Sequence, residues 1–395
     1  MAEGTFLPPA RLLDITRLTR RIGRVFTGVD RVEHAYLRAI AADPVPAFAL
    51  ARTALGYVLL DRAGMQTLLT RIAAQDWPAP DFVSRVNHRL DDSAKLGQTL
   101  VRQLSAQRCT RTRLKQMLDK AMPGGFAYLN VGHSNLTTRM LSTLQSMPQA
   151  RISVLIHDTI PLDFPQYQRP GTIDTFEAKL SRVSRFADRV ICISDAARQD
   201  VIGHMKRLGR VPDIVVAHLG VDAPVPAHSP QKRPYFVTVG TIEPRKNHGL
   251  LLDVWDRLGP DAPHLFICGN RGWNNDAIFA ALDAKPANVS EIAGLSDAEL
   301  AGLLQGAQAL LFPTFAEGFG LPPLEACALG TPAICSDLPV LRETLGNNAI
   351  YADPADVYQW EKQIKKLAGA DRSQVKVEFV PPTWEAHFKI VFTMT

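Results

Sequence analysis

The chain has little of what marks disulfide-rich, zinc-binding or membrane-spanning proteins. Its five cysteines are odd in number and none forms a C-x-x-C pair, which predicts buried free thiols rather than disulfides or zinc ligands. No run of 18 apolar residues occurs, and the first residues lack a basic segment followed by an apolar one. The sequence therefore predicts neither a transmembrane helix nor a signal peptide, and we expect a cytoplasmic protein.

Two nucleotide-binding patterns are also missing. The dinucleotide-binding fingerprint is a Gly-x-Gly-x-x-Gly after a strand, with an acidic residue about twenty positions further on. The sequence has no such combination, which argues against an NAD-dependent dehydrogenase. No Asp-x-Asp occurs, which argues against a metal-bridged diphosphate. We expect no metal and no cofactor.

Positive charge is in modest and local excess, with 44 Lys and Arg against 39 Asp and Glu. Aromatic residues are not interleaved with the basic clusters, which disfavours nucleic acid as a partner. Two interpretations stay open, namely peripheral contact with an anionic membrane surface and an ordinary solvated face. The clusters are Arg17, Arg20, Arg21 and Arg24, and then Arg102, Arg108, Arg111, Arg113, Lys115 and Lys120.

Short apolar runs alternate with longer helical patterns in both halves of the 395 residues, which predicts an α/β fold of two doubly wound domains with parallel sheets. A proline-rich stretch at 219–230 places the boundary, giving domains 1–222 and 223–380. The segment 69–120 is less regular and is interpreted as an insertion. The expected strands are 12–15, 45–51, 57–60, 127–131, 152–157, 189–193 and 214–217, followed by 235–239, 265–268, 290–292, 309–312, 333–335 and 350–351.

The stretch 312–325 carries the most informative motif, two glutamates eight positions apart around a Gly-Pro turn that opens a helix. Free N–H groups at that helix start point where a diphosphate could lie. Glu325, one turn into the helix, is placed to accept hydrogen bonds from ribose hydroxyls, and Glu317 on the loop could face the sugar. The alternative is that both are ordinary first-turn glutamates. The loop residues assigned to substrate binding are Gly318, Phe319, Gly320 and Leu321.

Cations follow two other strands of the second half, where ligands bind in open α/β sheets. Arg245 and Lys246 lie on a turn that begins at Gly240 and Thr241, and this pair suits a diphosphate. A surface turn with incidental charge is the alternative. We also expect Arg271, after the strand 265–268, to reach the same phosphates.

The first half contributes candidates from across the predicted cleft. His157 and Asp158 follow a strand, and the histidine could touch a sugar hydroxyl or, alternatively, satisfy a loop carbonyl. His133 follows another strand and is a second candidate for acceptor contact. Gly28 marks a helix start that could face the cleft, with Arg31 as its ligand-facing cation.

Taken together, these motifs resemble those of the retaining glycosyltransferases of family 4. The resemblance covers most of the chain through the stretches 28–31, 157–158, 193–195, 240–247, 269–273, 317–325 and 382–385. It implies the GT-B architecture, in which two Rossmann-like domains face each other across a cleft. It further implies that residues 381–395 form a helix that crosses back onto the first domain.

The resemblance also implies roles for individual residues. Glu325 would bind the donor ribose, Glu317 would lie near the reacting carbon, and Lys246 would hold the diphosphate. His157 would contact the transferred sugar. One departure is that Thr241 fills a position where many members carry arginine, so Arg245 is expected to share the phosphate role.

The implied activity is transfer of a hexose, with retention, from a nucleotide-diphosphate sugar to a lipid-linked or oligosaccharide acceptor in surface polysaccharide synthesis. GDP-mannose is the first choice of donor, with UDP- and dTDP-sugars behind it. A nucleotide-sugar epimerase of the same fold and a non-catalytic sugar-nucleotide-binding scaffold are the alternatives.

Overall fold

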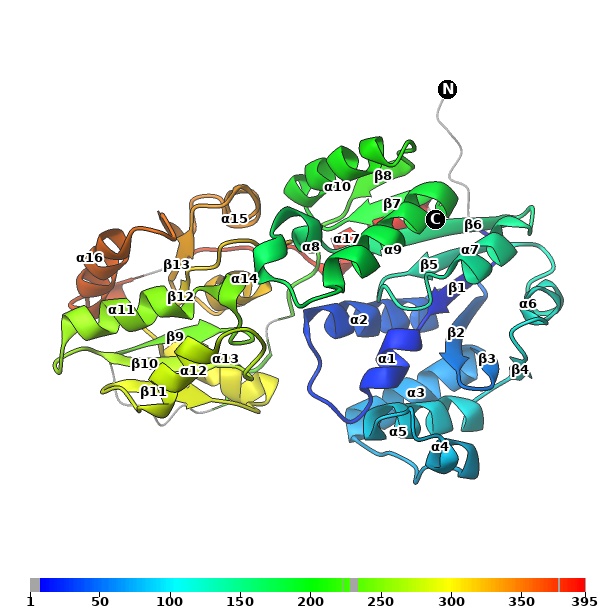
Figure 1. The fold of residues 1–395 in the computed structure, drawn as a ribbon, viewed down its shortest axis with the longest axis horizontal. Coiled ribbons are helices and arrows are strands. Elements are labelled where there is room, and N and C mark those ends of the chain that lie inside the picture. The colour runs from blue at the N-terminus through cyan, green and yellow to red at the C-terminus, as the bar shows by residue number, and fades with distance from the viewer. Residues whose placement is uncertain (1–7, 223, 228–233, 376, 395) are drawn as a thin grey trace.

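The computed structural model describes residues 8–222, 224–227, 234–375 and 377–394, and it has two α/β lobes, each built on its own sheet (Figure 1). The first sheet has eight strands in the order β4-β3-β2-β1-β5-β6-β7-β8. Its strands are β1 (Arg11–Asp14), β2 (Ala47–Thr53), β3 (Gly56–Leu60), β4 (Gln107–Cys109), β5 (Phe126–Asn130), β6 (Ala150–Ile156), β7 (Arg189–Cys192) and β8 (Asp213–Val216).

The first sheet is mixed rather than wholly parallel, which corrects the prediction. β3 pairs antiparallel with both β2 and β4 at one edge, whereas the other pairings are parallel. The two residues Ala54 and Leu55 join β2 to β3, and a connection that short permits only a hairpin. β4 was not predicted, because three residues with a polar composition carry no strand pattern.

The less regular segment 69–120 forms helices of the first lobe. It builds the end of α3, the helices α4 and α5, the strand β4 and most of α6, and α5 packs on α1. It is thus an integral part of the first lobe. The helices are α1 (Thr16–Arg21), α2 (Gly28–Ala42), α3 (Arg62–Ala74), α4 (Phe82–Val86), α5 (Asp92–Gln103), α6 (Leu114–Ala121), α7 (Thr138–Gln145), α8 (Ile160–Asp163), α9 (Thr172–Phe186) and α10 (Asp195–Arg207).

The second sheet is parallel throughout, as predicted, with the order β11-β10-β9-β12-β13-β14. This order reverses between β9 and β12, and in doubly wound sheets the crevice at such a point binds the ligand. The strands are β9 (Tyr235–Val239), β10 (His264–Cys268), β11 (Val289–Ile292), β12 (Ala309–Phe312), β13 (Ala333–Ser336) and β14 (Ile350–Ala352). The helices are α11 (His248–Leu258), α12 (Asp276–Asp283), α13 (Asp297–Gly306), α14 (Leu321–Ala328), α15 (Pro339–Leu345) and α16 (Val357–Ala368).

The C-terminal helix α17 (Trp384–Met394) returns to the first lobe, as the resemblance implied (Figure 1). His387 Nε2 lies 2.8 Å from the hydroxyl of Tyr36 on α2. A Cβ at Gly220 would lie 2.3 Å from the backbone nitrogen of Trp384, so only glycine permits this approach. The end of the chain therefore ties the two lobes together.

Three more predictions concern the cysteines, membrane-spanning helices and the domain boundary. All five cysteines are free thiols, and four of them are buried, which confirms the prediction for those four, whereas Cys109 is only half-buried. Within the described ranges, no helix is both long and apolar enough to cross a bilayer. The predicted domain boundary adjoins residue 223, which lies outside the described residues, and it stays a prediction.

Candidate active site

A cavity of about 480 Å³ lies between the two lobes, and nearly all of the predicted site residues line it. The start of α2 and the loop after β6 contribute from the first lobe, and the loops after β9 and β12 contribute from the second. The predicted residues that line it are Gly28, Arg31, His157, Asp158, Thr241, Arg245, Lys246, Glu317, Gly318, Phe319, Gly320, Leu321 and Glu325. His133 and Arg271 are the two that do not.

Glu317 is held by three donors that all reach the same carboxylate oxygen. Its Oε1 accepts from Arg245 Nη1 at 2.7 Å, Lys246 Nζ at 2.5 Å and Thr314 Oγ1 at 3.0 Å. Burial alone would raise the pKa of Glu317, but Lys246 and Arg245 outweigh it and lower that pKa. Its Oε2 accepts no hydrogen bond from the described residues. The cavity is thus lined by an ionised carboxylate with one oxygen available.

The two cations beside Glu317 come from the short 3₁₀ turn Pro244–Lys246 that precedes α11. Burial lowers the pKa of Lys246, and the charge of Glu317 opposes that shift. Arg245 also pairs with Glu243 at 2.7 Å. Glu243 is buried and was not assigned a role from the sequence, although its place two positions before Arg245 in the motif 240–247 could have indicated one.

Two glycines shape the loop that joins β12 to α14 and carries Glu317. A Cβ at Gly318 would lie 2.4 Å from the carbonyl oxygen of His157, so this position admits only glycine while the lobes are in contact. Gly320 precedes α14 with φ of +88°, a left-handed conformation that glycine adopts without strain. Gly318 thus brings this loop against the strand end of the first lobe, and Gly320 turns the chain into α14.

His157 presents one ring nitrogen to the cavity it lines. Its Nε2 lies 2.8 Å from the carbonyl oxygen of Val131, and because a carbonyl only accepts, Nε2 carries the proton. Burial lowers the pKa of His157 to about 4, so the ring is neutral at pH 7. Its Nδ1 is therefore an acceptor, and none of the described side chains donates to it. The loop-carbonyl contact weighed as the alternative is present on Nε2, and the sugar contact stays a prediction.

His133 lies behind His157 rather than in the cavity wall. Its Nε2 donates to the carbonyl oxygen of Leu155 at 2.8 Å, and its ring meets that of His157 edge-on with centroids 5.1 Å apart. Burial lowers the pKa of His133 well below its ordinary value. The structure therefore places His133 as a neutral support for the His157 ring and not at an acceptor surface.

Glu325 and Arg31 form an ion pair that joins the lobes across the cavity. Arg31 Nη1 of α2 lies 2.6 Å from Glu325 Oε1 of α14. Burial raises the pKa of Glu325, against the opposing charge of Arg31. Any ligand group that binds the Glu325 carboxylate would thus either share it with Arg31 or displace the Arg31 guanidinium.

Arg271 lies outside the cavity, which corrects its placement among the phosphate contacts. Its guanidinium pairs with Glu291 at 2.8 Å and with Asp283 at 2.7 Å. Those acids draw the side chain to the exposed edge formed by β11 and α12. The neighbouring Asn270 lines the cavity instead.

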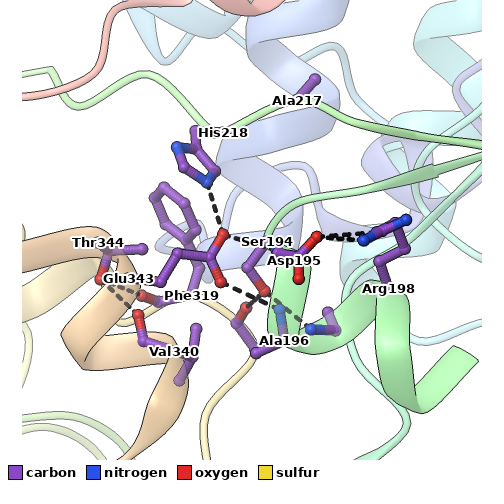
Figure 2. Close-up of polar contacts among 12 residues, drawn as sticks. Ser194, Asp195, Ala196, Arg198, Ala217, His218, Phe319, Val340, Glu343 and Thr344 are labelled. Atoms are coloured by element: carbon purple, nitrogen blue, oxygen red, sulfur yellow. Dashed lines mark hydrogen bonds and ion pairs between the residues drawn. The ribbon is translucent and has the colours of Figure 1, made fainter.

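A second set of contacts between the lobes lies beside the loop that carries Glu317 (Figure 2). Glu343 of α15 accepts from the backbone N–H groups of Asp195 and Ala196 at 2.6 and 3.0 Å, where α10 begins, and its Oε1 lies 2.8 Å from His218 Nε2. Ser194 Oγ donates to the carbonyl oxygen of Gly318 at 2.9 Å. The helix start of one lobe is thus bound by a carboxylate of the other, and the loop that carries Glu317 is fixed in the same place.

Solved structures with the same arrangement of lobes are GT-B glycosyltransferases. Anabaena HepE in complex with UDP-glucose matches with a TM-score of 0.62 at 13% identity, over 97% of this chain and 94% of that one. The lipopolysaccharide outer core galactosyltransferase WaaB matches with a TM-score of 0.57 at 15% identity, over 97% and 96%. The chain therefore has the GT-B fold.

Sequence comparison defines the second lobe more closely. Residues 224–376 match the family Glycosyl transferases group 1, so this part of the chain is a glycosyltransferase group 1 domain. The Escherichia coli serotype-specific mannosyltransferase WbdA is 32% identical over 230 residues, which are 51% of this chain and 28% of that protein. The Salmonella typhimurium O-antigen chain mannosyltransferase RfbU is 37% identical over 142 residues, 35% of this chain and 39% of that one. The chain thus spans well under half the length of these two relatives.

Proposed function

We propose that the protein is a glycosyltransferase that moves a hexose from a nucleotide-diphosphate sugar to a glycan or lipid-linked acceptor. The observation that carries this proposal is the cluster of charged side chains in the second lobe, where the strand order reverses between β9 and β12. There Glu317, Arg245 and Lys246 meet within hydrogen-bonding distance in a cavity closed by the other lobe. Two cations suit a diphosphate and one ionised carboxylate suits a developing positive sugar.

The chemistry follows from how charge moves when the glycosidic bond to diphosphate breaks. Negative charge grows on the departing phosphate, where Arg245 and Lys246 can stabilise it. Positive charge grows at the anomeric carbon, where the available Oε2 of Glu317 can stabilise it. His157 would accept a hydrogen bond from the transferred sugar, and Glu325 would accept from the ribose.

Retention of configuration is part of the proposal. In this route the acceptor hydroxyl attacks from the face that the diphosphate leaves, and the departing phosphate takes its proton. Contact between the lobes, through Arg31 and Glu325 and through Glu343, would exclude water and so favour transfer over hydrolysis. Charge stabilisation by the two cations would also let the reaction proceed without a metal.

GDP-mannose is the proposed donor, and surface polysaccharide is the proposed product. The names of the relatives support both, since WbdA, RfbU and the O-antigen chain mannosyltransferase B are all mannosyltransferases, two of them named for the O-antigen chain. The relatives match over only part of their length, so the proposal names a donor and a class of product but no particular acceptor or linkage.

The test is transfer of radiolabelled mannose from GDP-mannose into a lipid extract of the source cells, with labelled UDP- and dTDP-sugars in parallel and with a metal chelator present. We expect label in the glycolipid fraction with GDP-mannose, and its loss in the variant Lys246→Met. Transfer from a different nucleotide sugar would reassign the donor. Donor binding without transfer to any acceptor, or epimerised donor in solution, would contradict the proposed reaction.

A further inference from the structure

A second cavity, of about 380 Å³, lies wholly within the first lobe. Its volume falls in the range of about 300–1,000 Å³ that is usual for small-molecule sites. Its wall is strongly basic, with Arg20, Arg52, Arg89 and Arg111 among the lining residues and no Asp or Glu among them. Four parts of the chain that are distant in sequence therefore bring four guanidinium groups to one place.

None of these four guanidinium groups has a counter-charge in the described part of the chain. Elsewhere in the same lobe, Arg17, Arg24 and Arg102 each pair with an aspartate. The carboxylate next to the cavity in sequence, Asp91, is already engaged, because it accepts from the amide of Ala94 at the start of α5 and pairs with Arg24. Like charges gathered without a counter-ion repel one another, so this arrangement favours an anionic ligand.

A buried donor in the wall supports the same conclusion. Gln98 is only 3% exposed, and its Oε1 accepts from the backbone N–H of Ala54 at 3.0 Å. That bond fixes the orientation of the carboxamide, and among the described residues nothing accepts from its Nε2. The cavity wall thus holds an oriented amide donor in addition to the arginines, and both suit the oxygens of a phosphate.

Large apolar side chains are exposed next to the cavity. Leu55, at the hairpin tip that follows Ala54, is 60% exposed, and Phe82 and Val86 on α4, just before the cavity residue Asn87, are 71% and 52% exposed. Phe82 and Val86 are four residues apart and share one face of that helix. Exposed apolar groups beside a basic pocket are what a peripheral protein presents to an anionic bilayer.

We infer that this cavity binds a phosphate group carried on a lipid, while Leu55, Phe82 and Val86 contact the surrounding acyl region. Arg20 and Arg21 are consecutive residues of α1, and Arg20 lines this cavity whereas Arg21 lines the one between the lobes. One short helix therefore separates the bound phosphate from the proposed site of sugar transfer. The inference does not depend on that proposed reaction, because lipid binding is measured without any donor.

Two triple variants of equal charge test the inference. Arg52→Gln/Arg89→Gln/Arg111→Gln removes three guanidinium groups from the cavity. Arg113→Gln/Arg139→Gln/Arg185→Gln removes three exposed ones outside it that also have no ion-pair partner among the described residues. Co-sedimentation with phosphatidylcholine vesicles, with and without phosphatidylglycerol, compares both with the wild type. We expect the cavity variant to bind the anionic vesicles roughly tenfold or more weakly than the charge-matched control does.

Soluble pyrophosphate separates the two possible sources of the phosphate. It should raise the thermal midpoint of the control more than that of the cavity variant, since the cavity between the lobes contributes equally to both. A pyrophosphate difference without a vesicle difference would overturn the lipid as the source. Equal behaviour of the two variants with both probes would overturn the site altogether. A cooperative thermal transition without any ligand shows that each variant is folded, and the nucleotide response reports on the proposed function separately.

Discussion

At the scale of single residues, the shared oxygen of Glu317 gives the sharpest prediction. Glu317→Gln keeps the shape but removes the negative charge that faces Arg245 and Lys246. Those cations would then be freer to hold diphosphate, so we expect nucleotide affinity to be kept or increased while sugar transfer falls about 10²–10³-fold. Titration calorimetry and a transfer assay on the same preparation measure the two effects. A variant that loses both together would contradict the assigned role.

Residue types and their spacing predicted most of the site because the contributing residues follow recognisable strands. His157 comes directly after β6, and Lys246 and Glu317 lie on the loops that follow β9 and β12. Parallel strands bring such positions to one edge of the sheet. The sequence could not predict the position of Arg271, because its partners Asp283 and Glu291 approach it only through packing of α12 on β11.

At the scale of elements, Glu343 binds the start of α10 from the opposite lobe. Glu343→Gln removes the charged acceptor from two backbone amides and from His218, and we expect the free energy of unfolding to fall by about 1 kcal/mol. Asp337→Asn is the matched control, since it breaks an exposed pair with Arg342 inside one lobe and should cost less than about 0.5 kcal/mol. Urea denaturation measures both. Equal effects would show that the contact between the lobes adds no stability.

The C-terminal helix predicts a dependence of stability on pH. His387 donates from Nδ1 to the carbonyl oxygens of Ala217 and His218 and accepts from Tyr36, and burial lowers its pKa to about 4. Because that value lies below about 6.5 for an unfolded histidine, the unfolded chain binds more protons between the two values. Stability should therefore fall as the pH drops from about 6.5 to about 4.

His387→Gln tests this assignment, because the amide cannot gain a charge in this range. His34, His157 and His248 have pKa values lowered in the same way and will keep part of the slope. We expect the variant's free energy of unfolding to vary less steeply with pH, by up to about 1.4 kcal/mol per pH unit. An unchanged slope between pH 4 and 6.5 would mean that His387 already titrates normally in the folded protein.

At the scale of the whole molecule, the sequence predicted two α/β lobes but not how they meet. Hydrophobic runs mark buried strands whatever their direction, so the antiparallel edge of β3 and β4 was missed. The pair formed by Arg31 and Glu325 joins helices nearly 300 positions apart, and no local pattern encodes such a contact. The basic cavity was not predicted for the same reason, since it is built by four segments that are distant in sequence.

The proposed reaction requires that the cavity between the lobes binds a nucleotide diphosphate through its cations. Thermal unfolding with GDP, UDP, dTDP and ADP, each without a divalent metal, measures this binding, because a ligand that binds only the folded state raises the midpoint. We predict that GDP raises the midpoint of the wild type and leaves that of Lys246→Met nearly unchanged. A wild type that responds to none of the four, or a variant that responds as strongly as the wild type, would contradict the claim.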